Sequence, residues 1–258
     1  MLKKRLIAVL ILRQGQVVQS IRFKHTNVIH YDAVHAIDAF NKWAIDEIVI
    51  LNVTREESSR EQFAEVVSNV SRQCFVPLTA GGWIGDEDYA KRLLRSGADK
   101  LVLNTAVADN PDLVRTLSKR YGRQCIVASI DVKRDEDGDA RVAVDRGRKM
   151  TDSDPVMWAK KARDLGAGEI FFNSIDHDGA RKGYDLKTLT AICEAVDLPV
   201  IAFGGVFKWD HLAEGIGAGA EAAAAANIFH YTEQSTKKAK SFLANAGIQV
   251  RKEGRHGA

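Results

Sequence analysis

The sequence has few cysteines, and the three that it has are isolated. Cys74, Cys125 and Cys193 lie far apart in the chain and form no CxxC pair. This spacing excludes a disulfide-rich secreted domain and a zinc site built on paired cysteines. Each cysteine lies in or beside an apolar segment, so we expect small core residues in a protein of a reducing compartment.

Long hydrophobic runs are also missing. No apolar stretch approaches the ~20 residues that a membrane-spanning helix needs. The first residues, MLKKRLIAVLIL, begin like a signal peptide, but their apolar stretch is short and no small-residue cleavage site follows it. We therefore expect a cytoplasmic protein that has no membrane partner.

The sequence also lacks a large excess of either positive or negative charge. The 37 lysines and arginines nearly balance the 34 aspartates and glutamates, which gives a net charge of +3. The acidic residues are interspersed with the basic ones, so the sequence has no basic block of the kind that binds nucleic acid. Most of the excess lies in the last residues, RKEGRHGA, which we expect to be a frayed or appended end.

What the sequence does contain is a regular alternation of short apolar segments and stretches of helical period. The short segments are apolar on both faces, as parallel strands covered by helices require. In a chain of 258 residues, this pattern predicts a closed (β/α)8 TIM barrel rather than an open sheet. The predicted strands are LIAVLIL, EIVILNV, FVPLTA, KLVLNTA, CIVASID, EIFFNSID, LPVIAFGG and EAAAAANIF.

An internal repeat supports the barrel. Residues 76–107 align without a gap on residues 198–229, at an offset of 122 residues, and Gly82 falls on Gly204. We therefore predict two duplicated half-barrels, at roughly 1–122 and 123–250, in a single barrel over 1–258 with a tail at 251–258. The polar segment 133–155 after the fifth strand should form a small hairpin above the barrel.

Glycine pairs follow the third and seventh predicted strands, at the end of the barrel where catalytic residues lie. Backbone N–H groups beside glycines can hold a phosphate, because no Cβ intrudes. We therefore predict two phosphate cradles related by the internal twofold, although the same glycines would also serve as tight turns. The first cradle comprises Gly81, Gly82, Asn104 and Thr105, and the second comprises Gly179, Gly204, Gly205, Ala226 and Asn227.

Several longer motifs resemble one family, the HisF-type cyclase subunit of imidazole glycerol phosphate synthase. They are MLKKRLIAV at the start, GADKLVLNTA, SIDHDGARKGYD, FHYTE and the IQVRKEG end. The resemblance implies that a HisH-like glutaminase docks on the amino-terminal face of the barrel. It also implies that ammonia passes through the barrel to a bis-phosphorylated ribonucleotide. In the family, two aspartates at the carboxyl face act there as general acid and base.

The carboxyl face matches this family only in part. Asp131 matches the strand-five aspartate, and Asp178 matches a further position of the family's active site. The strand-one aspartate is Ile11, whose alkyl chain transfers no proton. Trp83 replaces the third glycine of the first cradle, where an indole should fill the space that a phosphate needs. The other departures are Gln19 for a lysine, Asn52 for an aspartate and Phe203 for a serine.

The opposite face matches the family well. Arg5, Glu47, Lys100 and Glu169 each stand at the entry to a predicted strand, and they match the residues of the family's ammonia gate. Two cations that alternate with two anions neutralise one another, so their burial is tolerable. The alternative is a purely stabilising charge network. Asp99 matches a family position that contacts the glutaminase.

The remaining polar candidates are weaker. His177 could be either a loop residue or a ligand contact. His25, His30 and His35 lie in and after the first loop, and no cysteine or carboxylate trio accompanies them, so we predict no metal site. His230 is expected to pack rather than react. No cofactor is implied.

Three hypotheses follow. In the first, the barrel docks a glutaminase and channels ammonia, but hands it to an ATP-dependent sugar amidotransferase that makes acetamidino sugars for bacterial surface polysaccharide such as lipopolysaccharide. In the second, it is a true cyclase, a lyase of histidine biosynthesis, in which Asp131 acts with another acid such as Asp178. In the third, it is a scaffold with no chemistry.

Overall fold

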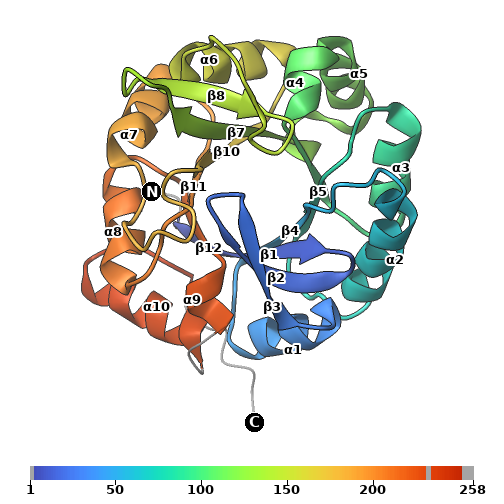
Figure 1. Ribbon diagram of the computed structural model, residues 1–258. Helices are drawn as coiled ribbons and strands as arrows, with labels where there is room; N and C mark the ends of the chain where they lie inside the picture. Colours follow the sequence, from blue (N-terminus) through green and yellow to red (C-terminus); the bar gives the residue numbers. More distant parts are fainter. Residues whose placement is uncertain (1–2, 231–233, 252–258) are drawn as a thin grey trace.

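The computed structural model describes residues 3–230 and 234–251. In this part of the chain, eight parallel strands close into a barrel, because β12 pairs with β1 at one seam and β10 pairs with β7 at another. The predicted TIM-barrel fold is confirmed (Figure 1). In order around the barrel, the strands are β1 (Arg5–Arg13), β4 (Glu47–Asn52), β5 (Leu78–Gly81), β6 (Lys100–Leu103), β7 (Ile126–Arg134), β10 (Glu169–Ser174), β11 (Val200–Phe203) and β12 (Ala222–Ala225).

Helices surround the barrel and cover the outer side of its strands (Figure 1). Their buried stripes pack on the outward-facing strand residues in one continuous hydrophobic core. The helices are α1 (Ala33–Lys42), α2 (Ser59–Ser71), α3 (Glu87–Arg95), α4 (Thr105–Asp109), α5 (Pro111–Tyr121), α6 (Pro155–Leu165), α7 (Leu186–Ala195), α8 (Trp209–Gly217), α9 (Asn227–His230) and α10 (Ser235–Asn245), with a 3-10 turn η1 (Arg123–Cys125).

Short polar side chains fix where several helices begin. An Asp or Asn side chain accepts a backbone N–H of the first turn, which satisfies a donor that the helix itself leaves unpaired. These N-caps are Asp32, Asp86, Asn110, Asp154 and Asp185, before α1, α3, α5, α6 and α7. The loops at the carboxyl face that lead into these helices therefore end at the N-cap residues.

The inward-facing side chains form a second, separate hydrophobic cluster, which we call the lumen cluster. Alternate residues of each strand point inward, because side chains of a strand alternate between its two faces. The lumen cluster consists of Ile7, Val9, Ile11, Val18, Val49, Val102, Val127, Phe171, Ile201, Phe203, Ala222 and Ala224, with Leu51, Val53 and Ala226 packed against it.

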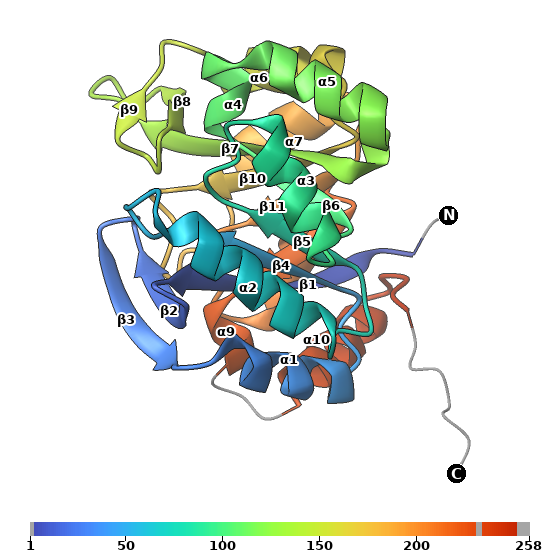
Figure 2. The same ribbon diagram turned by 90° about the vertical axis from the view of Figure 1, so that its right-hand side faces the viewer.

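Two antiparallel hairpins rise above the barrel. β1 continues into β2 (Gln16–Ile21) and β3 (His25–His30), and β7 continues into β8 (Ala140–Val144) and β9 (Lys149–Met150). Both project from the side opposite the amino terminus (Figure 2). The hairpin after β7 was predicted from the sequence, whereas the segment of β2 and β3 was expected to be a loop.

In the described part of the chain, no helix is long and apolar enough to cross a membrane. The tail predicted at 251–258 lies outside the described residues, except for its first residue.

Candidate functional site

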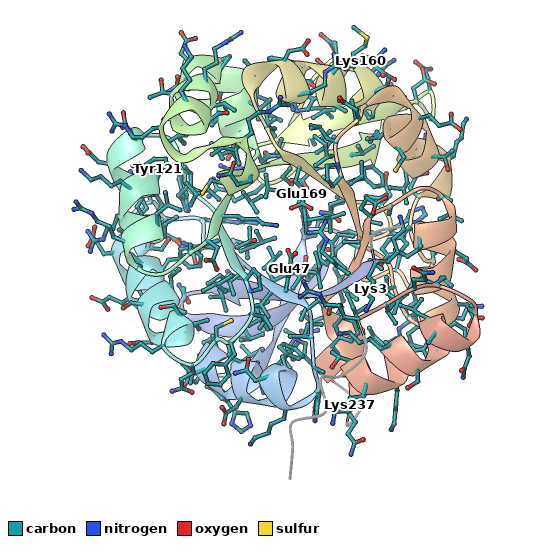
Figure 3. The ribbon with its side chains drawn as sticks, turned by 180° about the vertical axis from the view of Figure 1, so that it is seen from behind. Lys3, Glu47, Tyr121, Lys160, Glu169 and Lys237 are labelled. Atoms are coloured by element: carbon teal, nitrogen blue, oxygen red, sulfur yellow. The ribbon has the colours of Figure 1, made fainter. Side chains whose placement is uncertain are left out.

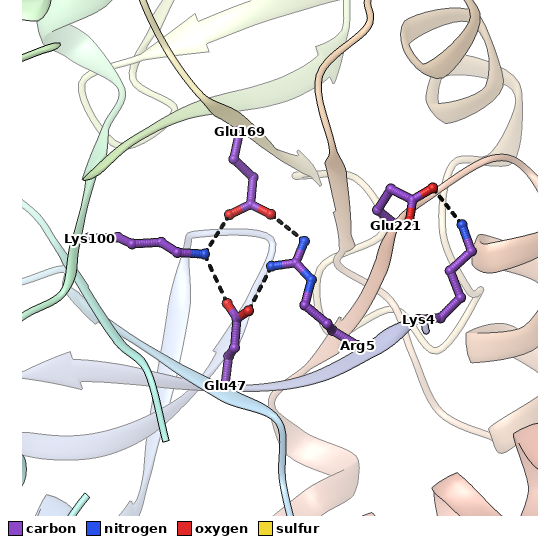
Figure 4. Close-up of polar contacts among 6 residues, drawn as sticks. All are labelled: Lys4, Arg5, Glu47, Lys100, Glu169 and Glu221. Atoms are coloured by element: carbon purple, nitrogen blue, oxygen red, sulfur yellow. Dashed lines mark hydrogen bonds and ion pairs between the residues drawn. The ribbon is translucent and has the colours of Figure 1, made fainter. Parts of the chain in front are cut away.

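The four predicted gate residues lie together at the amino-terminal end of the barrel. Arg5, Glu47, Lys100 and Glu169 are the first residues of β1, β4, β6 and β10, and they form a closed ring of ion pairs (Figure 4). Arg5 Nη1 lies 2.7 Å from Glu47 Oε1, and Arg5 Nη2 donates to Glu169. Lys100 Nζ lies 3.2 Å from Glu47 and 3.0 Å from Glu169. We call these four residues the charged ring.

The charged ring crosses the barrel axis with no net charge. Viewed from the amino-terminal face, Glu47 and Glu169 lie near the centre of the barrel (Figure 3). Their side chains are only 9% and 7% exposed, whereas those of Arg5 and Lys100 are 21% and 20% exposed. Burial lowers the pKa of Arg5, but attraction to the two carboxylates outweighs it and raises this pKa above its ordinary value. The Arg5 guanidinium therefore stays charged, and each carboxylate of the ring is bound by both cations.

Two exposed residues lie on the same face. Asp99 is exposed, and its carboxylate accepts the N–H of Leu78 at 2.8 Å, which ties β6 to β5. Phe75, in the loop that leads into β5, is 84% exposed. An exposed aromatic of this kind is typical of protein interfaces. The sequence analysis missed Phe75, and its only sequence signal was a bulky aromatic in a connecting loop.

Between the charged ring and the carboxyl end, the barrel interior is apolar. Ile7, Val49, Val127, Phe171 and Ile201 are at most 2% exposed and belong to the lumen cluster. Such an environment disfavours ions strongly and small neutral molecules much less. The interior is therefore chemically compatible with ammonia and not with ammonium.

A polar cluster lies at the carboxyl end of the interior, around Asp131. Its carboxylate accepts hydrogen bonds from Asn173 Nδ2 and Asn104 Nδ2, both at 3.2 Å, and from Ser129 Oγ at 3.3 Å. Burial raises the pKa of Asp131 to about 6, even though the hydrogen bonds from Asn173 and Ser129 favour its charged form. Asp131 is therefore suited to proton transfer near neutral pH. Ile11 is 5% exposed and lies in the lumen cluster.

The side chains of Trp83 and Arg146 lie at the first cradle and contact each other. The backbone of Trp83 has a left-handed φ of 61°, and its indole Nε1 donates to the carbonyl oxygen of Thr54 at 2.8 Å. The guanidinium of Arg146 lies 4.2 Å from the centre of the indole ring, in a cation–π contact. That this indole excludes a phosphate from the first cradle stays a prediction.

The hairpin of β8 and β9 holds Arg146 in place. Arg146 Nη1 donates to the carbonyl oxygens of Thr54 and Arg55, both at 3.3 Å. The N–H of Asp145 donates to Thr105 Oγ1 at 3.0 Å, and Asn104 Nδ2 lies 3.4 Å from the carbonyl oxygen of Ala143. The polar groups predicted for a phosphate at the first cradle are therefore bound to the hairpin.

The second cradle is open. A pocket of about 170 Å³ lies over the ends of β11 and β12. Its lining includes the backbone of Gly204 and Gly205, together with Asn227, Arg181 and Phe207. The Arg181 guanidinium lies 4.7 Å from the centre of the half-exposed Phe207 ring. The two halves of the carboxyl face thus differ, with Trp83 and Arg146 at one cradle and an accessible pocket at the other.

Packing alone accounts for the glycines of the second cradle. A Cβ on Gly204 would lie 2.6 Å from Asn173 Oδ1, and one on Gly205 would lie 2.3 Å from the carbonyl oxygen of Gly183. Both glycines also have φ values above 90°, which side chains disfavour. Their presence therefore gives no separate argument for a bound phosphate.

Asp178 lines this pocket, and its carboxylate binds the first hairpin. Its carboxylate accepts Ser20 Oγ at 2.6 Å and the N–H of Phe23 at 3.3 Å. Burial raises the pKa of this carboxyl, although the Ser20 hydrogen bond opposes the shift. Its neighbour His177 is bound through Nδ1 to the carbonyl oxygen of Gly183 at 2.7 Å. The structure does not bring Asp178 into hydrogen-bond contact with Asp131 among the described contacts.

The histidines form a small cluster at the side of the barrel. His30 Nε2 lies 3.2 Å from His230 Nδ1, and the rings of His30 and His35 lie 5.9 Å apart. Burial, with a smaller contribution from His30, lowers the pKa of His230 to about 4. Among residues 3–230 and 234–251, no group of three or more histidine, cysteine or acidic side chains is placed to hold a metal ion.

Two comparisons with known proteins relate the chain to histidine biosynthesis. The model of a family described as "Histidine biosynthesis protein" matches residues 5–235. A protein of Vibrio vulnificus (strain YJ016), provisionally named imidazole glycerol phosphate synthase subunit hisF2, is 41% identical over 253 residues. That alignment covers 97% of this chain and 92% of the relative.

Proposed function

The chain belongs to the histidine biosynthesis family and to its HisF-type branch, and on this basis we propose that it is the barrel subunit of a glutamine-dependent complex that conducts ammonia without cyclising a ribonucleotide. One contrast supports the proposal: the four residues of the charged ring are paired, whereas the side chains of Trp83 and Arg146 lie at the first cradle.

The partner at the amino-terminal face is a HisH-type glutaminase, which would release ammonia next to the charged ring. The exposed Phe75 and Asp99 on this face support such an interface. Of the two cations in the charged ring, Lys100 is the one that moves when ammonia passes. Its ammonium is held at 3.0 and 3.2 Å, whereas the guanidinium of Arg5 bridges both carboxylates with the stronger planar geometry.

The proposed acceptor is a sugar bound by a separate ATP-dependent amidotransferase, which converts an acetamido group into an acetamidino group on a surface polysaccharide. This choice is supported by the absence of a proton donor at Ile11 and by the apolar rim. Phe207, at the rim of the open pocket, is 53% exposed, which is more typical of an interface than of a solvated loop.

One observation favours a second candidate, the cyclase of imidazole glycerol phosphate synthase. Asp131 is buried at the carboxyl end of the interior, and its pKa of about 6 suits a general acid or base. The alternative requires the ribonucleotide to bind with one phosphate outside the first cradle. It also requires a second proton-transfer group in place of Ile11.

A direct assay separates the two candidates. The purified barrel is given the bis-phosphorylated ribonucleotide substrate of imidazole glycerol phosphate synthase and an ammonium salt at high pH, and imidazole product is measured. We expect turnover at least about a thousandfold below that of an ordinary cyclase barrel run as a positive control, because general acid–base catalysis alone contributes ~10²–10⁴-fold. Turnover close to that of the control would refute the proposal.

The variant Ile11→Asp serves as the companion control in the same assay. It restores a carboxylate at the end of β1 but leaves Trp83 and Arg146 in the first cradle. We therefore expect it to remain inactive. Substantial activity in this variant would show that the lost acid, and not the side chains at the first cradle, is what prevents cyclisation.

A further inference from the structure

Two phenylalanine rings close the upper part of the barrel interior on one side. Phe171 of β10 and Phe203 of β11 are 1% and 4% exposed, and their ring centres lie 5.1 Å apart. Both belong to the lumen cluster. Phe203 also lines the open pocket of the second cradle. One face of this residue is therefore turned to the interior and another to the pocket.

The neighbouring strand has only small side chains. β12 reads AAAA, and its Ala222 and Ala224 face the interior, while Ala225 and Ala226 line the pocket. Phe203 therefore fills volume that β12 leaves empty. The adjoining pocket holds about 170 Å³, which leaves space beside Phe203 for a change of its side-chain rotamer.

In the other half of the carboxyl face, polar contacts among the described residues hold the side chains in place. Trp83 is fixed by its hydrogen bond to Thr54, and Arg146 covers it while donating to two carbonyl oxygens. Moving either side chain breaks several polar contacts. The aromatic ring of Phe203 has no hydrogen bond to break, so its rotation opens the interior at a lower cost.

We propose that Phe203 is an aromatic gate between the barrel interior and the pocket of the second cradle, and that this pocket is the exit port of the barrel. The identity of the passing molecule as ammonia rests on the proposed function. The position of the gate does not, because it follows from the Phe171–Phe203 stack, the alanines of β12 and the contacts of Trp83 and Arg146 at the first cradle.

Thiol labelling of a cysteine behind the gate tests this assignment. In the variant Ala224→Cys, the new thiol lies in the interior, and its modification by methyl methanethiosulfonate is followed by mass spectrometry of the peptide that carries it. Adding Phe203→Ala should accelerate labelling by at least about tenfold, which corresponds to an opening barrier lowered by about 1.4 kcal/mol. Adding Trp83→Ala should leave the labelling rate unchanged.

Phe172→Ala is the matched control. Phe172 lies next to Phe171 on β10 and is fully buried, but it faces the outer core, so its loss loosens packing without opening the interior. An unchanged labelling rate with Phe203→Ala would overturn the assignment of Phe203 as the gate. So would an equal acceleration with Phe172→Ala or Trp83→Ala. Cyclase turnover in the assay above would instead refute the proposed function and leave the labelling result standing.

Discussion

At the scale of the residue, Asp131 links the chemistry of the carboxyl face to the stability of the protein. Its pKa of about 6 lies above the ordinary value of 3.8, so the folded protein binds this proton more tightly than the unfolded chain does. Stability from this group is therefore complete below about pH 4 and is lost as the pH rises through about 6. This direction is opposite to that of a carboxylate held by a salt bridge.

The variant Asp131→Asn tests this sign, because an asparagine does not ionise. Between pH 4 and pH 7, the parent protein should lose about 3 kcal/mol of unfolding free energy through this group, from roughly two pKa units at about 1.4 kcal/mol each. The variant should not show this loss. Urea unfolding at the two pH values measures the difference. Asp112→Asn, whose side chain is 94% exposed in the parent, is the control and should show little change. A variant that loses stability between the same pH values would contradict the buried, hydrogen-bonded carboxyl.

At the scale of the element, the hairpin of β8 and β9 and the turn at Trp83 decide which half of the carboxyl face is accessible. Trp83 adopts a left-handed φ of 61°, which costs a residue with a Cβ about 1 kcal/mol or more. The indole's hydrogen bond to Thr54 and its contact with Arg146 offset this strain. Substitutions at Trp83 can measure the strain separately from these contacts.

Trp83→Gly and Trp83→Ala both remove the indole, but only alanine keeps a Cβ at the left-handed φ. We expect the alanine variant to be less stable than the glycine variant by about 1 kcal/mol. At Glu65, an exposed position in the middle of α2, the same pair should show the opposite order, because alanine favours a helix over glycine by about 1 kcal/mol. Chemical denaturation of the four variants measures both differences. If the glycine variant were the less stable one at both positions, the left-handed turn at Trp83 would be contradicted.

The elements also show how far the sequence could be read. Strand positions were predictable from strand periodicity, and the entries of parallel strands place the residues of the charged ring on one face. Their reading as a gate, and the indole in place of a glycine of the first cradle, came from the family resemblance. The first hairpin and the role of Arg146 were not predictable. The turn of the first hairpin holds Arg22 and Phe23 at positive φ, and Asp145 and Arg146 adopt the same region. Turn prediction depends on glycine, asparagine or aspartate at such positions, and the turn of the first hairpin has none of these at Arg22 and Phe23.

Asp178 gives a second example of what the sequence leaves out. The sequence left it open as a polar loop residue or a ligand contact, with a match to an active-site position of the family, and in the structure its carboxylate binds Ser20 and the N–H of Phe23. These partners lie more than 150 residues away in the chain. Their identity depends on how two loops meet over the barrel, which no local pattern encodes.

At the scale of the whole molecule, the charged ring connects the stability of the barrel to its proposed role. Lys100→Met removes one cation and leaves two buried glutamates that share Arg5. Breaking such a network leaves uncompensated charge and should destabilise the barrel by about 3 kcal/mol. The double variant Lys100→Met/Glu47→Gln restores neutrality, and it should recover most of that loss in urea unfolding.

The same neutral double variant tests conduction, because it keeps the fold while it removes the ammonium group of Lys100 from the charged ring. In the assembled complex with its glutaminase and acceptor, we expect product formation with glutamine to fall severalfold relative to product formation with an ammonium salt. Ammonia should then escape to solution, where a coupled glutamate dehydrogenase assay detects it. An unchanged ratio would mean that the ring only stabilises the barrel, since a scaffold needs its charges balanced but does not need them to move.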